Sequence, residues 1–151
     1  MRRLTLTLPL AALILAGAGC GAATNVQTNP VNGNVTYQGG AGEHGEVGAN
    51  VQLPENWPSD VPIYAGANIV SATTIAQGIS VLFQSSDSAA TVSDWYQARL
   101  TASGWMKKAE HDIGIQRVRV YEKGDVTLTV SSSTADDGGS ATLLLWAPNS
   151  R

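Results

Sequence analysis

Only one segment of this sequence has the spacing of a helix, and it lies between two groups of strand patterns. Its apolar side chains form one helical stripe at Val92, Trp95 or Tyr96, and Leu100. Residues 86–88 contain N-cap candidates, and Gly104 suits the C-terminal end. Because one helix can cover only one face of a sheet, the pattern predicts a two-layer α+β domain.

Strand patterns flank the helix on both sides. Alternating apolar and polar residues indicate strands at 68–75, 79–85, 105–111, 116–121, 126–130 and 141–146. The connections are short enough for hairpins, which predicts a mostly antiparallel sheet of about five to six strands in the order ββαβββ. The last strand carries Leu143, Leu144 and Leu145 in a row, which indicates burial on both faces or a central place in the sheet.

Composition excludes several classes of protein. Hydrophobic residues make up 43% of the chain, too many for a wholly disordered protein. Charged residues make up 14%, and the net charge of −3 leaves no basic excess for binding nucleic acid. A single cysteine excludes an internal disulfide, and with two separated histidines it excludes the common zinc frameworks. We therefore expect no metal, no cofactor and no nucleic-acid partner.

The N-terminus has the order of an export signal. Two arginines follow Met1, an apolar run occupies residues 4–15, and small residues lead to Cys20. The apolar run is too short to span a bilayer as a helix. The small residues followed by Cys20 resemble the lipobox of bacterial lipoprotein signals, although Gly17 stands where leucine is usual.

This resemblance implies cleavage before Cys20, a lipid on its sulfur and an anchored protein on the extracytoplasmic side of a membrane. Gly21, rather than an acidic residue, follows the cysteine, which favours the outer membrane in a cell that has one. The alternative is ordinary cleavage after Ala18, which gives a soluble protein with a free thiol.

Composition also divides the chain into three parts. Residues 1–19 form the expected signal, 20–52 a lipidated cysteine with a flexible Gly/Asn-rich tether, and 53–151 the α+β domain. The second part has few large apolar side chains, so burial there does not offset the entropy of ordering the chain. A weak hairpin of residues 34–37 and 46–47 is the alternative for part of this segment.

The start of the domain and the end of its helix carry a further resemblance. The residues concerned are Leu53-Pro54, Trp57-Pro58, Asp60-Val61-Pro62 and Gly66 before the strands, and Gly104-Trp105 after the helix. Their arrangement resembles the domains of small, uncharacterised bacterial envelope lipoproteins. The resemblance implies an envelope protein and supplies no catalytic residues.

No group of residues in the sequence has the pattern of an enzyme site. The histidines are His44 and His111, and no serine lies in a Gly-x-Ser-x-Gly motif. On a strand, Glu110 and Asp112 share one face and His111 the other, which is the wrong geometry for chelating a metal. The acidic pair at 136–137 indicates a solvated turn, with weak calcium binding as the alternative. We expect the protein not to be an enzyme.

The candidates for a binding surface are Trp57, Trp146, Arg117, Arg119 and Tyr121. The last three alternate on one face of a predicted strand, where arginine suits an acidic partner or lipid headgroups. The alternative is a solvated face on which the arginines pair with acidic neighbours. The two tryptophans mark a binding surface if they are exposed, and core packing is the alternative.

Together these features predict a lipid-anchored cell-envelope protein that acts as a non-enzymatic binding or structural module. A sheet face or the segment around Trp57 would contact another envelope protein. The alternative function is extracytoplasmic small-ligand binding, in a cleft between the helix and the sheet.

Overall fold

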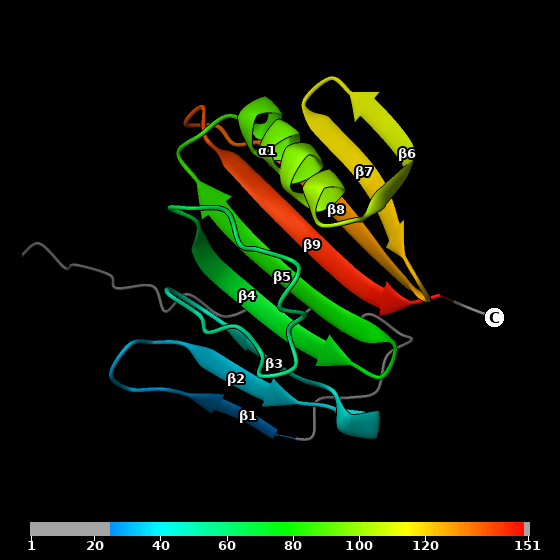
Figure 1. Ribbon diagram of the computed structural model, residues 1–151. Coiled ribbons are helices and arrows are strands. Elements are labelled where there is room, and N and C mark those ends of the chain that lie inside the picture. Colours follow the sequence, from blue (N-terminus) through cyan, green and yellow to red (C-terminus); the bar gives the residue numbers. More distant parts are fainter. Residues whose placement is uncertain (1–24, 150–151) are drawn as a thin grey trace, which may run out of the picture.

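The computed structural model describes residues 25–149. Within this range all strands join one antiparallel sheet, and helix α1 packs on one face near one end (Figure 1). The spatial order of the strands is β1-β2-β3-β4-β5-β9-β8-β7-β6. The elements are β1 (Asn25–Thr28), β2 (Val35–Gln38), the 3₁₀ turn η1 (Gly40–Gly42), β3 (His44–Val47), β4 (Asn68–Ile75), β5 (Gly78–Ser85), α1 (Ala89–Ala102), β6 (Met106–Ile113), β7 (Gln116–Lys123), β8 (Val126–Thr134) and β9 (Ser140–Pro148).

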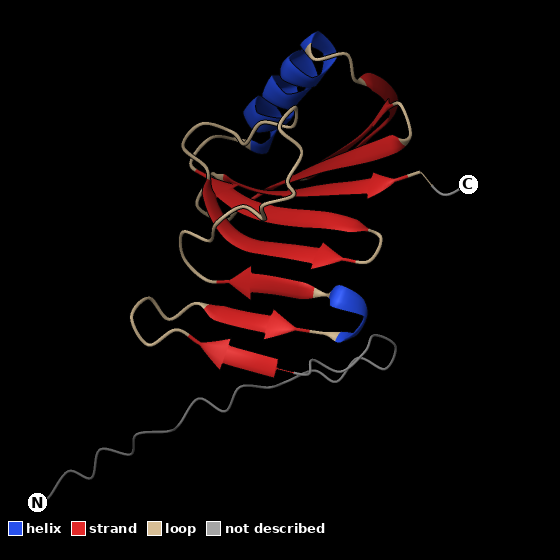
Figure 2. Ribbon diagram, turned by 60° about the horizontal axis from the view of Figure 1, so that its bottom comes forward, coloured by secondary structure: helices blue, strands red, loops and turns tan. Residues whose placement is uncertain are grey.

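The expected fold class is wrong in the extent of the sheet. We predicted a two-layer α+β domain with five to six strands, and the described residues form one nine-stranded sheet with a single α-helix. The additional strands are mainly β1–β3, which precede the segment where the domain was expected to begin. Helix α1 contacts β6–β9, so it cannot form a complete second layer over a sheet of this width (Figure 2).

Strands β1–β3 lie within 20–52, the segment expected to be a flexible tether. β2 and β3 form the hairpin considered as the alternative, with Val35 opposite Val47. β3 also pairs with β4, where Val47 lies opposite Ser71. Main-chain hydrogen bonds along the edge of the larger sheet therefore replace the apolar burial that these residues lack.

The elements after residue 67 match the six predicted strand segments, of which four follow the helix rather than the three in the order ββαβββ. Strands β4 and β5 precede α1, and β6–β9 follow it. The helix begins and ends as expected: Ser88 Oγ accepts a hydrogen bond from the Thr91 amide at 3.2 Å, and Gly104 takes a φ of +84°. β9 returns to the middle of the sheet and pairs with both β5 and β8.

The core lies between the sheet, α1 and the connection 51–64. Its largest fully buried side chains include Phe83, Tyr96, Tyr121, Leu128 and Leu144. The helical stripe of Val92, Tyr96 and Leu100 is buried as predicted. Val51 and Val61 belong to the same cluster, so the connection covers part of the sheet that the helix does not reach.

The run of leucines in β9 predicted either burial on both faces or a central place in the sheet, and only the second alternative is confirmed. β9 has a central place in the sheet, but its residues are buried on one face alone. Leu144 is fully buried, whereas Leu143 and Leu145 are 40% and 37% exposed on the opposite face. No helix among residues 25–149 has the length and apolar character needed to cross a membrane.

Candidate functional site

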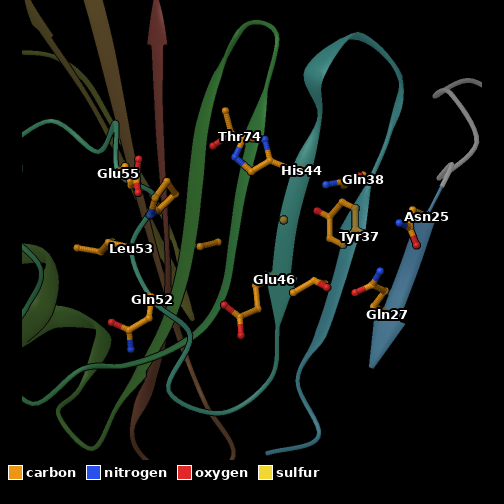
Figure 3. Close-up of a pocket in the computed structure, with 14 residues that line it drawn as sticks. Asn25, Gln27, Tyr37, Gln38, His44, Glu46, Gln52, Leu53, Glu55 and Thr74 are labelled. Carbon is orange, nitrogen blue, oxygen red and sulfur yellow. The ribbon is translucent and has the colours of Figure 1, made fainter. Parts of the chain in front are cut away.

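A hollow of about 490 Å³ lies at the end of the sheet remote from α1, over β1–β4 (Figure 3). We call it the polar hollow. Its floor is the same face of the sheet that forms the core elsewhere, and its wall is the segment 52–55. Hydrogen bonds from the Gly48 amide to Val70 O and from the Val51 amide to Ile69 O, both 3.0 Å, tie the chain to β4 just before that wall.

The floor consists of two cross-strand rows. Asn25, Gln38, His44 and Thr74 form one row, and Gln27, Thr36, Glu46 and Ala72 form the other. Side chains that are opposite one another on neighbouring strands share a face, so all eight point to the same side. Seven of them carry polar groups on a part of the sheet that α1 does not cover.

Glu46 is held in place by a buried amide. Asn34, which is 2% exposed, donates from Nδ2 to Glu46 Oε1 at 2.7 Å. The same side chain donates to Ala49 O at 3.2 Å and accepts from the Ala49 amide at 3.0 Å. Among the described residues, no donor meets the second Glu46 oxygen, so that oxygen is available to a ligand in the hollow.

Thr74 and His44, opposite each other in one row, also offer unpaired groups. Thr74 Oγ1 is buried and has no hydrogen-bond partner among the described residues. His44 Nδ1 lies 3.1 Å from Gly42 O. A carbonyl can only accept, so Nδ1 carries the proton, and Nε2 of the neutral ring is an acceptor. A buried hydroxyl without a partner is costly.

The charged side chains that line the hollow are acidic. Its charged lining groups are the carboxylates of Glu46 and Glu55, and no lysine or arginine of residues 25–149 lines it. Its apolar surface comes from the wall residues Leu53 and Pro54 and from Ala72 on the floor. The site therefore combines side-chain amides, hydroxyls and carboxylates with an apolar lining surface that is larger than the polar one.

Two of the three residues predicted to form a surface, Arg119 and Tyr121, are buried, whereas Arg117 is partly exposed. Arg119 is buried and donates to Ser93 O at 2.7 Å, to Asp94 Oδ1 at 2.9 Å and to Glu110 Oε1 at 2.9 Å. Burial lowers the pKa of Arg119, but these hydrogen bonds outweigh burial and leave the pKa raised. Tyr121 is fully buried, and burial raises the pKa of its hydroxyl.

The cations near this cluster are also paired, as the alternative interpretation held. Arg117 lies 3.6 Å from Asp94 and 3.7 Å from Asp112. Lys107 bonds to Glu110, and together with Arg119 it holds the pKa of that carboxyl below its usual value. Each positive charge therefore has an acidic neighbour, and the arginines join the helix to the sheet.

The two candidate tryptophans are half-buried and pack against the core. Trp57 Nε1 donates to Val61 O at 2.8 Å, which fixes the turn of the connection 51–64. Trp146 lies in the row that continues Thr74 and Ile79 across the sheet. Neither tryptophan lines the polar hollow. Trp105 is buried, and Trp95 packs edge-on against Tyr96 with ring centroids 4.9 Å apart.

The remaining candidates do not form a metal site in the part of the chain that is described. No three His, Cys, Asp or Glu side chains gather there. In the segment 110–112, both carboxylates pair with basic residues. Asp137 Oδ1 accepts from the Gly139 amide at 3.0 Å and closes its own turn. Cys20, the expected lipidation site, lies outside the described residues.

The expected cleft between helix and sheet is filled by core side chains, among them Tyr96 and Phe83 with ring centroids 6.2 Å apart.

The sequence does contain a signal for the polar hollow. Polar residues alternate in Asn25-x-Gln27, Thr36-x-Gln38 and His44-x-Glu46, and this period-two pattern marks a polar sheet face.

A family model described as START domain-like matches residues 68–140. This range runs from β4 to the first residue of β9 and includes α1. No curated protein and no solved structure matches the chain. The family match indicates a ligand-binding module in coarse terms, and β1–β3, which supply most of the floor of the hollow, lie outside the matched range.

Proposed function

We propose that this protein is a non-enzymatic, extracytoplasmic module that binds a small ligand in the polar hollow and is held to a membrane by a lipid on Cys20. The observation that carries the ligand site is the pair of polar rows left uncovered beside a solid core. A volume of about 490 Å³ falls in the usual range for small-molecule sites.

The START domain-like match supports a binding role without naming the ligand. Such a site is expected to hold groups that the fold itself does not need. Thr74 Oγ1 and the second oxygen of Glu46 meet this condition, because no protein partner satisfies them among the described residues. Ligand groups would supply the missing hydrogen bonds.

The anchor would place this hollow near the bilayer. Four residues, 21–24, join Cys20 to Asn25, which lines the hollow. At full extension this connection reaches roughly 17 Å. The lipid would therefore hold β1 much closer to the membrane than a long tether would, and the hollow would face material at or near the membrane surface.

The ligand site can be tested with a blocking variant and a matched control. Gln27→Trp would fill the hollow from β1, whereas Val26→Trp adds the same ring on the opposite face, where Val26 is 60% exposed. The full chain is screened by thermal unfolding against saccharides, amines, fatty acids and nucleosides. A ligand at 100 times its Kd should stabilise the wild type and Val26→Trp by about 2.7 kcal/mol, and Gln27→Trp far less. The proposal fails if no class stabilises the wild type, or if Gln27→Trp responds equally.

The anchor has its own test. Cys20→Ser should move the protein from the detergent phase to the aqueous phase, because the thioether to the lipid cannot form. A Cys20→Ser protein that still enters the detergent phase would contradict lipid anchoring at this residue.

A second candidate function is docking of another envelope protein on the opposite face of the sheet. Leu143 and Leu145 are 40% and 37% exposed there, and Leu82 lies opposite Leu143. Exposed apolar patches on a sheet are typical of protein contacts. Crosslinking in native membranes should then give a partner that is lost in Leu145→Glu. A partner retained by that variant would contradict docking on this face.

A further inference from the structure

We infer that the ligand of the polar hollow is a neutral saccharide, bound through its hydroxyl groups. This inference rests on the proposed function, since it names the chemical class of ligand for the same site. It follows from three properties of the hollow: the sign of its charge, the kind of hydrogen-bonding groups on its floor, and the place of its apolar wall.

The charge disfavours anionic ligands. In the part of the chain that the structure describes, the lining groups include Glu46 and Glu55 and no lysine or arginine. A phosphate or carboxylate would therefore enter a hollow that repels it, without the bidentate arginine that such groups require. Nucleotides, acidic sugars and the phosphate groups of lipids are thus poor ligands for this site.

The floor matches hydroxyl groups, each of which donates one hydrogen bond and accepts others. Asn25, Gln27 and Gln52 provide side-chain amides, which both donate and accept. Glu46 and His44 Nε2 provide acceptors, and Thr74 Oγ1 provides a buried hydroxyl that needs a partner. Neighbouring hydroxyls on a sugar ring can meet these donors and acceptors, which lie side by side in the two rows (Figure 3).

The wall suits the apolar side of a sugar ring. Leu53 and Pro54 stand beside the floor, and Ala72 contributes the one apolar side chain of the two rows. A fatty acyl chain, by contrast, would bury the amides and carboxylates of the floor without hydrogen bonds. Each such group costs about 1–3 kcal/mol, so a polar floor of this kind rejects an apolar ligand.

The inference is tested on the full chain, purified from membranes in a detergent without a sugar headgroup. Calorimetric titrations use chitotriose, mannotriose, maltotriose and galactose as neutral probes, with a glycan array to extend the panel. Glucose 6-phosphate, spermidine and laurate represent anionic, cationic and apolar ligands. We expect saturable 1:1 binding of at least one neutral saccharide, at least tenfold tighter than binding of any charged or apolar probe.

Two variants and a control locate the binding. Thr74→Val and Glu46→Gln should each weaken the saccharide at least tenfold, because each removes a group that bonds a sugar hydroxyl. Thr129→Val is the control, because it makes the same chemical change in β8 on the face of the sheet opposite to the hollow. It should leave the affinity for the saccharide unchanged. Thr74→Val removes an unpaired hydroxyl, so it should fold as well as the wild type.

The possible outcomes separate this inference from the proposed function. Spermidine or laurate binding that Gln27→Trp abolishes, without saccharide binding, would overturn the inference and keep the ligand site. Saccharide binding that persists in Thr74→Val and Glu46→Gln would overturn the assignment of this hollow. No binding of any probe or array member would overturn the inference, and no stabilisation by any class in the thermal screen would overturn the ligand site as well.

Discussion

The two ends of this sheet share one face and use it in opposite ways. A single cross-strand row runs from Gln27 and Thr36 at one end, through Ala72 and Val81, to Arg119 and Glu110 at the other. Beneath α1 the row meets a solid core, and every charge near it has a partner. Over β1–β3 the row consists of the polar residues Gln27, Thr36 and Glu46. Helix α1 does not cover this end of the sheet (Figure 2).

This difference indicates which residues serve stability and which are free to serve binding. At the covered end, Arg119 and its acidic partners are needed to bury a charge at a helix–sheet contact. At the uncovered end, the polar side chains of β1 and β2 are exposed and join no core cluster. Mutations should therefore divide sharply between the two ends.

The largest effect is expected from a truncation in the core at the covered end. Phe83→Ala should lower the free energy of unfolding by about 3–5 kcal/mol, because Phe83 is fully buried against Tyr96. Thr36→Ala, exposed at the uncovered end, should change it by about 0.5 kcal/mol or less. Urea unfolding measures both. Equal losses would contradict the comparison.

Arg119→Met should lower the free energy of unfolding by about 1–3 kcal/mol, since Ser93 O loses its donor and two carboxylates lose a cation. Asp94 and Glu110 are partly exposed and regain water, which limits the loss. Arg117→Met, on the same strand but more exposed, should cost about 1 kcal/mol or less. A larger effect from Arg117 than from Arg119 would show that the buried guanidinium is not the principal link.

Asn34→Ala should lower the free energy of unfolding by about 1–2 kcal/mol, because one buried amide bonds both Glu46 and Ala49. The loss should be local. Hydrogen exchange should accelerate in β2, β3 and residues 48–50, and remain slow in β8 and β9. Uniform acceleration across the sheet would show that the uncovered end unfolds together with the core.

The smallest effect concerns pH. Lys107 and Arg119 hold the pKa of Glu110 below its ordinary value of 4.5. Between the lowered pKa and 4.5 the unfolded chain binds more protons, so stability rises with pH in that window. The contribution is complete above 4.5 and is lost on acidification through the lowered pKa. Glu110→Gln should therefore flatten the acid limb of stability against pH. An unchanged acid limb in Glu110→Gln would contradict this pairing.

Local sequence signals accounted for the covered end. Ser88 and Gly104 delimit α1, and alternating apolar residues gave β4, β5, β7, β8 and β9. These signals suffice because each element is specified by its own caps, turns and buried face. The side of β7 covered by α1 was not predictable, since it depends on Asp94 and Ser93 reaching Arg119 from another element.

The uncovered end was missed for a different reason. β1–β3 have too little apolar surface to indicate a folded unit, and they are ordered by pairing with the edge of β4. The hollow further depends on Leu53 and Pro54 crossing that face, which requires knowledge of the path of the connection. The polar alternation in β1–β3 was visible in the sequence, but without the pairing it did not indicate a shared face.

Backbone amide NMR of the full chain during a titration with the neutral saccharides tests the central claim most directly. The account predicts shifts confined to β1–β4 and residues 52–55, with α1 and the Leu143 and Leu145 face of β9 unchanged. Shifts centred on α1 or on that leucine face, or no shift at saturating saccharide, would contradict the assignment of binding to the uncovered end.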